Sequence, residues 1–353
     1  MPVWNRRSVI TGLAAGMVAG LRPVPARVED SPPIGDMHAH YFLVGPKPTV
    51  QPLARGMARG RASLVSWSLV GDMPWIRPSA RGLRQSGTPK PGDASKWFED
   101  ELARVKAHIT EQDLKIAYTP ADLDRALKGE PHILLSVEGA SFLDDGIAGL
   151  KRAHDLGIRH LQLVHFVRNA IGDFQTEAPR HHGLTSFGRE VIQECNRLGI
   201  LVDLAHSTAE MVHQALEISR VPLVWSHSSV APGGQSNRKV AAWRDRQLGL
   251  EEARAIAAKG GVVGLWALRS DVGATAETYA ERLIEMAALL GDDHVAFGTD
   301  MNALSRSPIS TYADLRRAVT HMEARGLDRA RLQKITIGNY IRVLRRAMEG
   351  AHA

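Results

Sequence analysis

Five side chains that can bind a metal ion stand at the ends of apolar runs in this sequence. The first run closes with the pair His38-Ala39-His40, and three later runs close with Glu138, His206 and His227. Alternate residues of a strand point to the same face, so the two imidazoles of the pair can hold one ion where a strand ends. Neutral imidazole and carboxylate ligands suit zinc, with manganese or cobalt as substitutes. The spacing therefore predicts a metallohydrolase centre.

The elements that carry these side chains alternate between apolar, β-rich runs and amphipathic stretches. The predicted strands span residues 34–38, 63–70, 132–138, 158–165, 200–206, 221–227, 261–268 and 294–299. The predicted helices span residues 97–110, 146–156, 186–198, 208–218, 250–259, 277–290, 312–325 and 328–348. Continuous apolar strands are buried on both faces, as in a parallel sheet covered by helices. Eight of them alternating with helices favour an α/β fold of the (β/α)8 TIM-barrel type over an open sheet.

The loops of this barrel are expected where the sequence is rich in Pro, Gly and Arg. These irregular stretches are residues 41–60 and 71–96, after the first two predicted strands, and residues 230–243, after His227. Long loops in compact domains are usually functional or disordered. Since they follow strands, they are expected to lie over the catalytic mouth of the barrel.

The active site of such a barrel lies at the carboxyl ends of its strands. This rule adds two more polar side chains to the candidate site. His165 ends the fourth predicted strand, and Asp300 comes just after the eighth. Asp300 is expected to take a proton from the attacking water and to pass it to the leaving nitrogen. His165 is expected to donate a hydrogen bond to the developing oxyanion. Any one of these histidines alone would more often be a buried packing residue, so the interpretation depends on the whole set.

The number of candidate ligands predicts two metal ions. Four histidines and a carboxylate are too many for one tetrahedral site that keeps an open position. In a two-metal arrangement, Glu138 bridges the ions, His38 and His40 bind one of them, and His206 and His227 bind the other. A hydroxide shared by the ions would be the nucleophile near neutral pH.

Several motifs resemble those of the membrane (renal) dipeptidase family of zinc metallopeptidases. They are Ser136-Val137-Glu138-Gly139, Leu161-Gln162-Leu163-Val164-His165, Gly183-Leu184-Thr185-Ser186-Phe187-Gly188, Asn196-Arg197-Leu198-Gly199-Ile200, Asp203-Leu204-Ala205-His206, Ser226-His227-Ser228-Ser229, Phe297-Gly298-Thr299-Asp300 and Gly338-Asn339-Tyr340-Ile341-Arg342-Val343. The resemblance covers nearly the whole chain after the N-terminal leader. It implies a homodimeric enzyme with a barrel and a two-zinc centre that hydrolyses dipeptides. It also implies the metal and catalytic roles given above, and it assigns Arg238 to the substrate's free carboxylate.

Three departures from the family pattern leave the substrate open. His40 stands where the family usually has Asp, Trp266 where a tyrosine is expected near the substrate amine, and Lys239 where Asn often follows the arginine. Trp266 is expected to contact the substrate, but tryptophan offers an N–H donor and no acceptor for an amine. One alternative is therefore an amidohydrolase for N-acyl amino acids, D-residue dipeptides or cyclic amides. Another is a metal-retaining binding protein without catalysis, against which Asp300 and His165 argue.

Residues 1–26 resemble an export signal, which leaves residues 27–353 as a single catalytic domain. Arg6 and Arg7 precede a short Gly- and Ala-rich apolar run, and small residues end at Ala26. This pattern is typical of a cleaved leader, and the paired arginines indicate the twin-arginine route to a periplasmic or extracellular location. The run is too short and too rich in glycine to span a membrane.

The composition of the chain is that of an ordinary soluble globular protein. Of 353 residues, 44% are hydrophobic and 23% are charged. Cleavage after Ala26 would remove Arg6, Arg7 and Arg22, so the formal charge of 44 − 38 = +6 would become 41 − 38 = +3. No stripe of basic residues with interleaved aromatics is present, which argues against a nucleic-acid partner. Cys195 is the single cysteine, so no disulfide can form within the chain.

Overall fold

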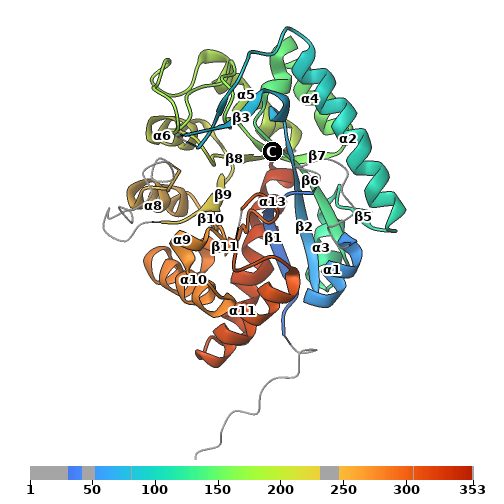
Figure 1. The fold of residues 1–353 in the computed structure, drawn as a ribbon, viewed down its shortest axis with the longest axis vertical. Helices are drawn as coiled ribbons and strands as arrows, with labels where there is room; N and C mark the ends of the chain where they lie inside the picture. Colours follow the sequence, from blue (N-terminus) through green and yellow to red (C-terminus); the bar gives the residue numbers. More distant parts are fainter. Residues whose placement is uncertain (1–30, 42–51, 81, 231–245, 305, 352–353) are drawn as a thin grey trace, which may run out of the picture. The chain divides into compact units, whose positions relative to one another are not determined.

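Eight parallel strands form the wall of a barrel in the computed structural model, which describes residues 31–41, 52–80, 82–230, 246–304 and 306–351 (Figure 1). In the order in which neighbours pair, the strands are β1 (Ile34–Ala39), β2 (Ala62–Val70), β6 (His132–Glu138), β7 (Ile158–Gln162), β8 (Leu201–Asp203), β9 (Val224–Ser228), β10 (Val262–Leu265) and β11 (Val295–Phe297). A short strand, β5 (Lys115–Ile116), pairs with β6 outside this order. The strands are continuous buried runs, as expected for a sheet covered by helices.

Backbone hydrogen bonds between the segment after β11 and β1 complete the barrel. The amide of Asp300 donates to the carbonyl of His38 at 3.0 Å, and the amide of His40 donates to the carbonyl of Met301 at 2.9 Å. Ala39 and Met301 also form a parallel bridge. The structure therefore confirms the predicted (β/α)8 TIM barrel, as a nearly closed barrel of eight strands.

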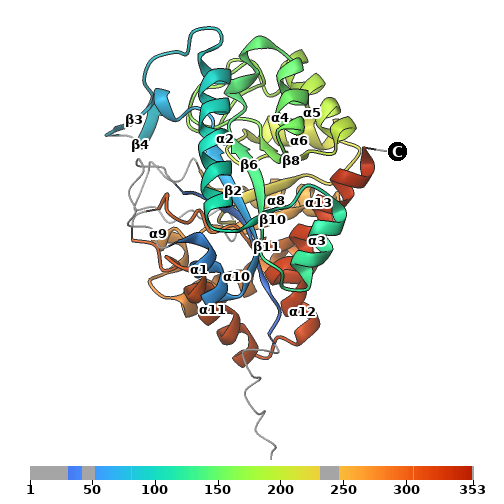
Figure 2. The ribbon, with the colours of Figure 1, turned by 90° about the vertical axis from the view of Figure 1, so that its right-hand side faces the viewer.

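Helices surround the barrel wall in both views of the ribbon (Figures 1 and 2). They are α1 (Leu53–Gly60), α2 (Asp93–Glu111), α3 (Pro120–Leu127), α4 (Ala148–Asp155), α5 (Ser186–Leu198), α6 (Ala209–Ile218), α8 (Leu250–Ala258), α9 (Arg269–Val272), α10 (Ala276–Leu290), α11 (Tyr312–Ala324), α12 (Arg329–Gln333) and α13 (Asn339–Gly350). Threonine begins several of them, because its side-chain oxygen can accept a bond from an otherwise unpaired amide of the first turn. Thr185, Thr208, Thr275 and Thr311 do so in α5, α6, α10 and α11.

The predicted strands and the helices that follow them are present, but short elements were missed. The stretch 41–60, predicted to be irregular, contains α1, and no helix was predicted at α3. The stretch 71–96 contains an antiparallel hairpin of β3 (Ile76–Ser79) and β4 (Gly82–Gln85). The predicted helix 328–348 is divided into α12 and α13 by a π-helical turn, Lys334–Gly338. Elements of eight residues or fewer carry too few periodic positions for a clear sequence signal.

Helix α13 closes one end of the barrel from below the strands. Its residues Tyr340 and Leu344 pack in one buried cluster with Leu64 of β2 and Leu134 of β6. The Tyr340 hydroxyl lies 2.9 Å from Nδ1 of His160, so the helix reaches the polar interior of the barrel as well. The opposite end, where the strands finish, is left for the polar side chains predicted to bind metal.

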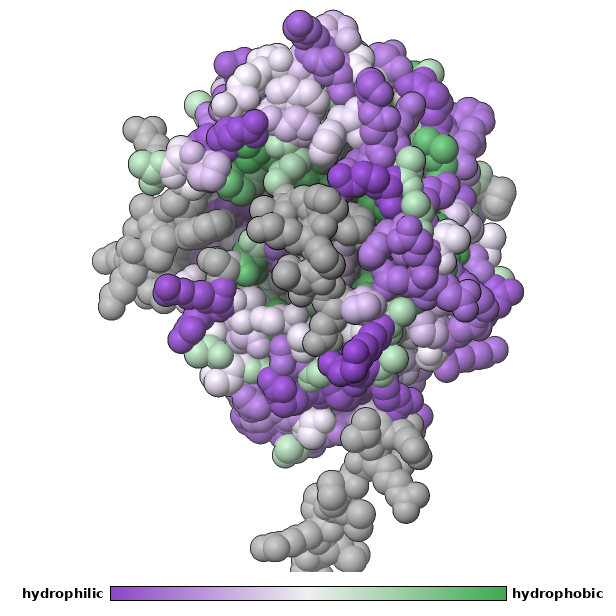
Figure 3. Space-filling view, turned by 45° about the vertical axis from the view of Figure 1, so that its right-hand side comes forward, coloured by the Kyte–Doolittle hydropathy of each residue, from purple (hydrophilic) through white to green (hydrophobic). Residues whose placement is uncertain are grey.

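The surface of the described residues carries little exposed hydrophobic area. The exposed large hydrophobic side chains among them are Leu83 and Tyr118. Figure 3 shows a face on which most of the described side chains are hydrophilic, with hydrophobic ones scattered between them. No helix in the described ranges is both long and apolar enough to cross a membrane.

Candidate metal centre

The first pair of predicted ligands is held together at the end of β1. The Nε2 atoms of His38 and His40 lie 3.0 Å apart, and both side chains are buried. Two nitrogens on one tetrahedral zinc ion lie roughly 3.3 Å from each other, given Zn–N bonds of about 2 Å. Nδ1 of His40 donates to the carbonyl of Ser68 at 3.0 Å, which leaves the Nε2 lone pair for a metal. Nδ1 of His38 lies 3.1 Å from the Ser68 hydroxyl.

The second pair joins the loop after β8 to the end of β9. The Nε2 atoms of His206 and His227 lie 3.3 Å apart, again close to the spacing of two ligands on one ion. Burial, together with nearby positive groups, holds the pKa of both imidazoles well below the ordinary value. Both residues are therefore neutral near pH 7, the form that binds metal. His206 has a φ of 70°, a left-handed conformation that is uncommon outside glycine and concentrates at functional sites.

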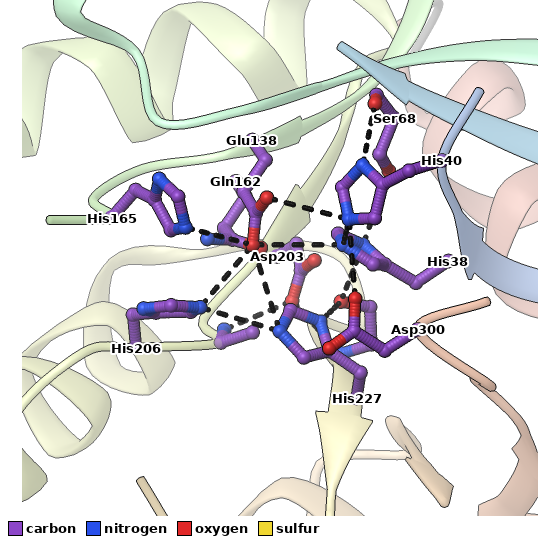
Figure 4. A network of polar contacts seen from close by, with 12 residues as sticks. His38, His40, Ser68, Glu138, Gln162, His165, Asp203, His206, His227 and Asp300 are labelled. Atoms are coloured by element: carbon purple, nitrogen blue, oxygen red, sulfur yellow. Dashed lines mark hydrogen bonds and ion pairs between the residues drawn. The ribbon is translucent and has the colours of Figure 1, made fainter. Parts of the chain in front are cut away.

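Glu138, the last residue of β6, lies between the two pairs (Figure 4). Its Oε1 is 3.2 Å from Nε2 of His206, and its Oε2 is 3.6 Å from Nε2 of His40. Burial alone would raise its pKa, but the surrounding imidazoles outweigh burial and hold the pKa well below the ordinary range. The carboxylate is thus ionised and contacts both pairs, since Oε1 also lies 3.6 Å from Nε2 of His38 and 3.6 Å from Nε2 of His227.

The two residues predicted to handle protons border the same cluster. Oδ1 of Asp300 lies 3.2 Å from Nε2 of His40, and Nε2 of His165 lies 3.3 Å from Oε1 of Glu138. Asp300 also has a left-handed φ of 55°, which turns its side chain back toward the end of β1. Burial opposes a positive charge on His165, but the carboxylates of Asp72 and Glu138 raise its pKa above the ordinary value.

The donor set fits divalent metal ions with nitrogen and oxygen ligands. Three overlapping groups of three buried side chains have ligand atoms within 4.8 Å of one another: His38–His40–Asp300, His38–Glu138–His227 and Glu138–His165–His206. Imidazole and carboxylate are the ligands of zinc and related metals. All seven residues that the sequence singled out at strand ends therefore lie in one cluster.

Two predicted substrate-binding residues, Arg238 and Trp266, do not belong to this cluster. Arg238 lies outside the described residues. Trp266 directly follows β10, and its ring centroid is 6.5 Å from that of His227. However, its Nε1–H donates to Oδ2 of Asp271 at 2.9 Å, so this N–H is already used within the protein. The expectation that Trp266 contacts the substrate stays a prediction, because only its N–H is committed to Asp271.

Two residues of the site were missed by the sequence prediction. Asp72 accepts a hydrogen bond from Nδ1 of His165 at 2.7 Å and is fully buried. Its other oxygen accepts the amides of Phe166 and Val167 at 3.1 and 2.9 Å, so it fixes the start of the loop that carries His165. Asp72 follows the apolar run of β2 by two residues, and strand-end position was the signal that could have revealed it.

The second missed residue is Arg246, whose guanidinium is buried beside the second pair. Its Nη2 lies 3.1 Å from Nε2 of His227, and only 5% of the residue is exposed. Burial lowers the pKa of Arg246 to about 10, so it is charged at neutral pH. No carboxylate of the described residues forms an ion pair with it, and its Nε has no hydrogen-bond partner there. Several arginines occur between 238 and 246, so sequence position alone could not select this one.

Comparison with known proteins places the chain in a family. The family model described as membrane dipeptidase (peptidase family M19) matches residues 57–353. Dipeptidase 3 of Mus musculus is 31% identical over 229 residues, which are 60% of this chain and 44% of that protein. Dipeptidase tcpJ of Claviceps purpurea (strain 20.1) is 30% identical over 255 residues, which are 70% of this chain and 58% of that protein. The chain thus spans about half the length of these curated relatives.

Solved structures share the fold at low sequence identity. A metallopeptidase from Rhodobacter sphaeroides, liganded with a phosphinate mimic of the dipeptide L-Ala-D-Ala, matches with a TM-score of 0.74 and 20% identity, over 90% of this chain and 100% of that chain. An amidohydrolase from Pseudomonas aeruginosa matches with the same TM-score and identity, over 92% and 99%. The family follows from the match over residues 57–353: the chain belongs to the membrane dipeptidase family, peptidase family M19.

Proposed function

We propose that the protein is a metal-dependent dipeptidase with two divalent ions, most simply zinc, in its active form. The observation that carries this proposal is the ionised, buried carboxylate of Glu138 between two pairs of imidazole nitrogens. His38 and His40 would hold one ion, His206 and His227 the other, and Glu138 would contact both. Bound there, the ions would lower the pKa of a water molecule and polarise the substrate carbonyl.

Proton transfer is assigned to Asp300. Its carboxylate lies 3.2 Å from Nε2 of His40, at the edge of the cluster where a water between the two pairs would be within reach. A carboxylate there can accept the proton of the attacking water and return it to the leaving nitrogen. The exposed fraction of its side chain is 10%, so bulk water competes little for that proton.

His165 is assigned to the developing oxyanion. Its raised pKa favours the imidazolium, in which Nδ1 donates to Asp72 while Nε2 is a second donor toward the centre. Because Asp72 is itself fixed by two backbone amides, the ring is oriented before substrate binds. A preoriented donor in a site shielded from water stabilises the charge of the tetrahedral species.

Arg246 is proposed to bind the free carboxylate of the substrate. A buried guanidinium without an acidic partner among the described residues is suited to an incoming anion. Its planar donors match the two oxygens of a carboxylate. Arg238 remains a second candidate for this role. Comparing Arg238→Lys with Arg246→Lys would decide between them, since the residue that binds the carboxylate should give the larger rise in KM.

Amides other than ordinary L-dipeptides are a second candidate class of substrate. The Trp266 N–H is taken by Asp271, and His40 replaces an acid that could face an ammonium group. Both features reduce the number of acceptors for a free amine near the centre. N-acyl amino acids, D-residue dipeptides and cyclic amides therefore stand beside ordinary dipeptides in the substrate test.

The domain boundaries, the location and the oligomer are further proposals. We propose an export leader over residues 1–26, read by the twin-arginine route, and a catalytic domain over 27–353. Mass spectrometry of the exported protein should find a mature N-terminus after Ala26, and an Arg6→Lys, Arg7→Lys double variant should stay inside the cell. A homodimer is proposed from the resemblance to the family, and light scattering of the purified protein tests it.

The decisive experiment pairs metal analysis with a substrate panel. Purified protein should contain two zinc ions per chain, lose activity with a chelator and recover it with zinc. The panel should contain Ala-Ala, N-acetyl-alanine and L-Ala-D-Ala, a mimic of which is bound in the Rhodobacter sphaeroides neighbour. Glu138→Gln should abolish hydrolysis, whereas Glu111→Gln, an exposed change at the end of α2, should not. Full activity of Glu138→Gln would exclude the proposed centre.

A further inference from the structure

Arg246 is held between two aromatic rings in the described structure. Its guanidinium carbon lies 5.5 Å from the ring centroid of Phe166 and 5.5 Å from that of Trp266. A cation over an aromatic face is attracted by the ring quadrupole, the more so where water is excluded. We name Phe166, Arg246 and Trp266 the arginine clamp. Since both rings are fixed by the fold, the clamp limits the directions in which the guanidinium donors can point.

Asp271 connects the clamp to the segment that carries the arginine. Its Oδ2 accepts the Nε1–H of Trp266 at 2.9 Å and the side-chain amide of Gln247 at 3.1 Å. Gln247 follows Arg246 in the chain, so one carboxylate oxygen holds both the indole and the side chain next to Arg246. The hydroxyl of Ser228 adds a second attachment, because it donates to the carbonyl of Arg246 at 3.1 Å.

These contacts assign a role to Trp266, which takes no part in the proposed chemical steps. The N–H of the Trp266 indole donates to Oδ2 of Asp271 and not to a ligand atom of the metal cluster. The shared effect of Trp266 and Asp271 is on the orientation of Arg246, the residue proposed to bind the incoming anion.

We propose that Trp266 and Asp271 are positioning residues that make this enzyme selective for substrates with a free carboxylate, acting through Arg246. The proposal rests on the proposed function of Arg246 as the carboxylate-binding group. The clamp should affect which substrates bind and should not affect the rate of the chemical step. Loosening the clamp should weaken binding of a carboxylate while leaving binding of the matching carboxamide unchanged, because a neutral amide gains little from an oriented guanidinium.

The test compares two ligands that cannot be hydrolysed, Ala-ψ(CH2NH)-Ala and its C-terminal amide, by titration calorimetry on the zinc-loaded protein. The acid should bind wild type more tightly than the amide. Asp271→Ala and Trp266→Leu should each lower this preference by about tenfold, a size typical of a lost buried cation–π contact. Trp266→Phe keeps a ring and removes the N–H, so its loss should be smaller. Asp155→Ala, an exposed change on α4, is the matched control and should change nothing.

A double-variant cycle separates positioning from general damage. In an Arg246→Lys background, Trp266→Leu should no longer change the preference for acid over amide, because the two residues act through one group. Equal loss of affinity for acid and amide in Asp271→Ala and Trp266→Leu would overturn the proposal, as would full additivity in the cycle. If wild-type protein hydrolysed no dipeptide but still bound the acid more tightly than the amide, the proposed reaction would be wrong and the clamp would stand. If wild-type protein hydrolysed dipeptides but the variants lost equal affinity for acid and amide, the clamp would be wrong and the proposed reaction would stand.

Discussion

The guanidinium of Arg246 and the imidazole of His227 lie 3.1 Å apart, measured from Nη2 to Nε2. A guanidinium can only donate hydrogen bonds, so this contact uses the Nε2 lone pair of His227. A metal ion bound by His227 uses the same lone pair. Metal binding there therefore requires the guanidinium to turn away from this nitrogen.

The first prediction concerns Arg246→Met, which removes this competing donor and a buried positive charge. Zinc should bind the His206–His227 pair more tightly, by roughly tenfold, because two like charges repel strongly at short range away from water. At the same time KM for Ala-Ala should rise, since the carboxylate loses its partner. Competition with a fluorescent zinc chelator measures the first effect, and steady-state kinetics the second. Weaker zinc binding in the variant would show that Arg246 supports the metal site.

The second prediction concerns Asp72→Asn, which keeps the size of the side chain and removes its charge. His165 would lose the carboxylate that orients it through the 2.7 Å hydrogen bond to Nδ1. We expect kcat to fall by roughly 10- to 100-fold, as for other residues that orient a group at a metal centre, with KM and zinc content nearly unchanged. Asp155→Asn is the control. A fall in zinc content parallel to kcat would assign Asp72 to the integrity of the centre rather than to His165.

The third prediction concerns pH and Asp203, a buried residue of β8 whose Oδ2 lies 3.3 Å from Nε2 of His160. Burial alone would raise the pKa of Asp203, but the side chain of His160 and backbone amides outweigh burial and lower it. The unfolded chain therefore binds the proton more readily, so this carboxylate adds stability above about pH 4 that is lost as the pH falls through its folded pKa.

Asp203→Asn should accordingly destabilise the metal-free protein most near neutral pH, by roughly 3 kcal/mol, the cost of breaking a buried pair. The difference between variant and wild type should shrink as the pH falls below about 4. Urea unfolding across this range measures it. A difference that stays constant with pH would mean that Asp203 contributes through packing and not through its charge.

The fourth prediction concerns the single cysteine, Cys195, which is fully buried in α5. Burial raises the pKa of its thiol, and the neighbouring Glu194 adds to the shift. The reactive thiolate is therefore absent at about pH 8, where exposed cysteines begin to ionise. A disulfide reagent should not react with the native protein and should react fully once guanidinium chloride unfolds it. Rapid reaction of the native protein would show that α5 opens locally.

The barrel and most of its metal cluster could be predicted because both follow from one local pattern. Each buried strand is a short apolar run, and Glu138 and His227 lie within the last two residues of β6 and β9. His165 and His206 lie three residues beyond their strands, yet the apolar run continues to them, so the pattern still includes them. Parallel strands place such ends together, which makes local sequence sufficient.

The residues that the sequence did not reveal depend on tertiary contacts. Asp72 becomes a partner of His165 only because β2 and the loop after β7 end at the same side, 93 positions apart in the chain. Arg246 was one of several arginines after β9, and its burial between Phe166 and Trp266 follows from packing alone. The acceptor of the Trp266 N–H lies in α9, a short helix that no sequence signal marked.

The position of Tyr340 determines when the barrel can complete its folding. It belongs to the last helix, yet its hydroxyl lies inside the barrel against His160, and its ring packs among the starts of several strands. During synthesis, the strands emerge from the ribosome long before α13 does, and the interior cannot be completed without it. The barrel therefore cannot finish folding until α13 has been synthesised, so a chain that stops before α13 would expose both a hydrophobic opening and a polar interior to chaperones and proteases.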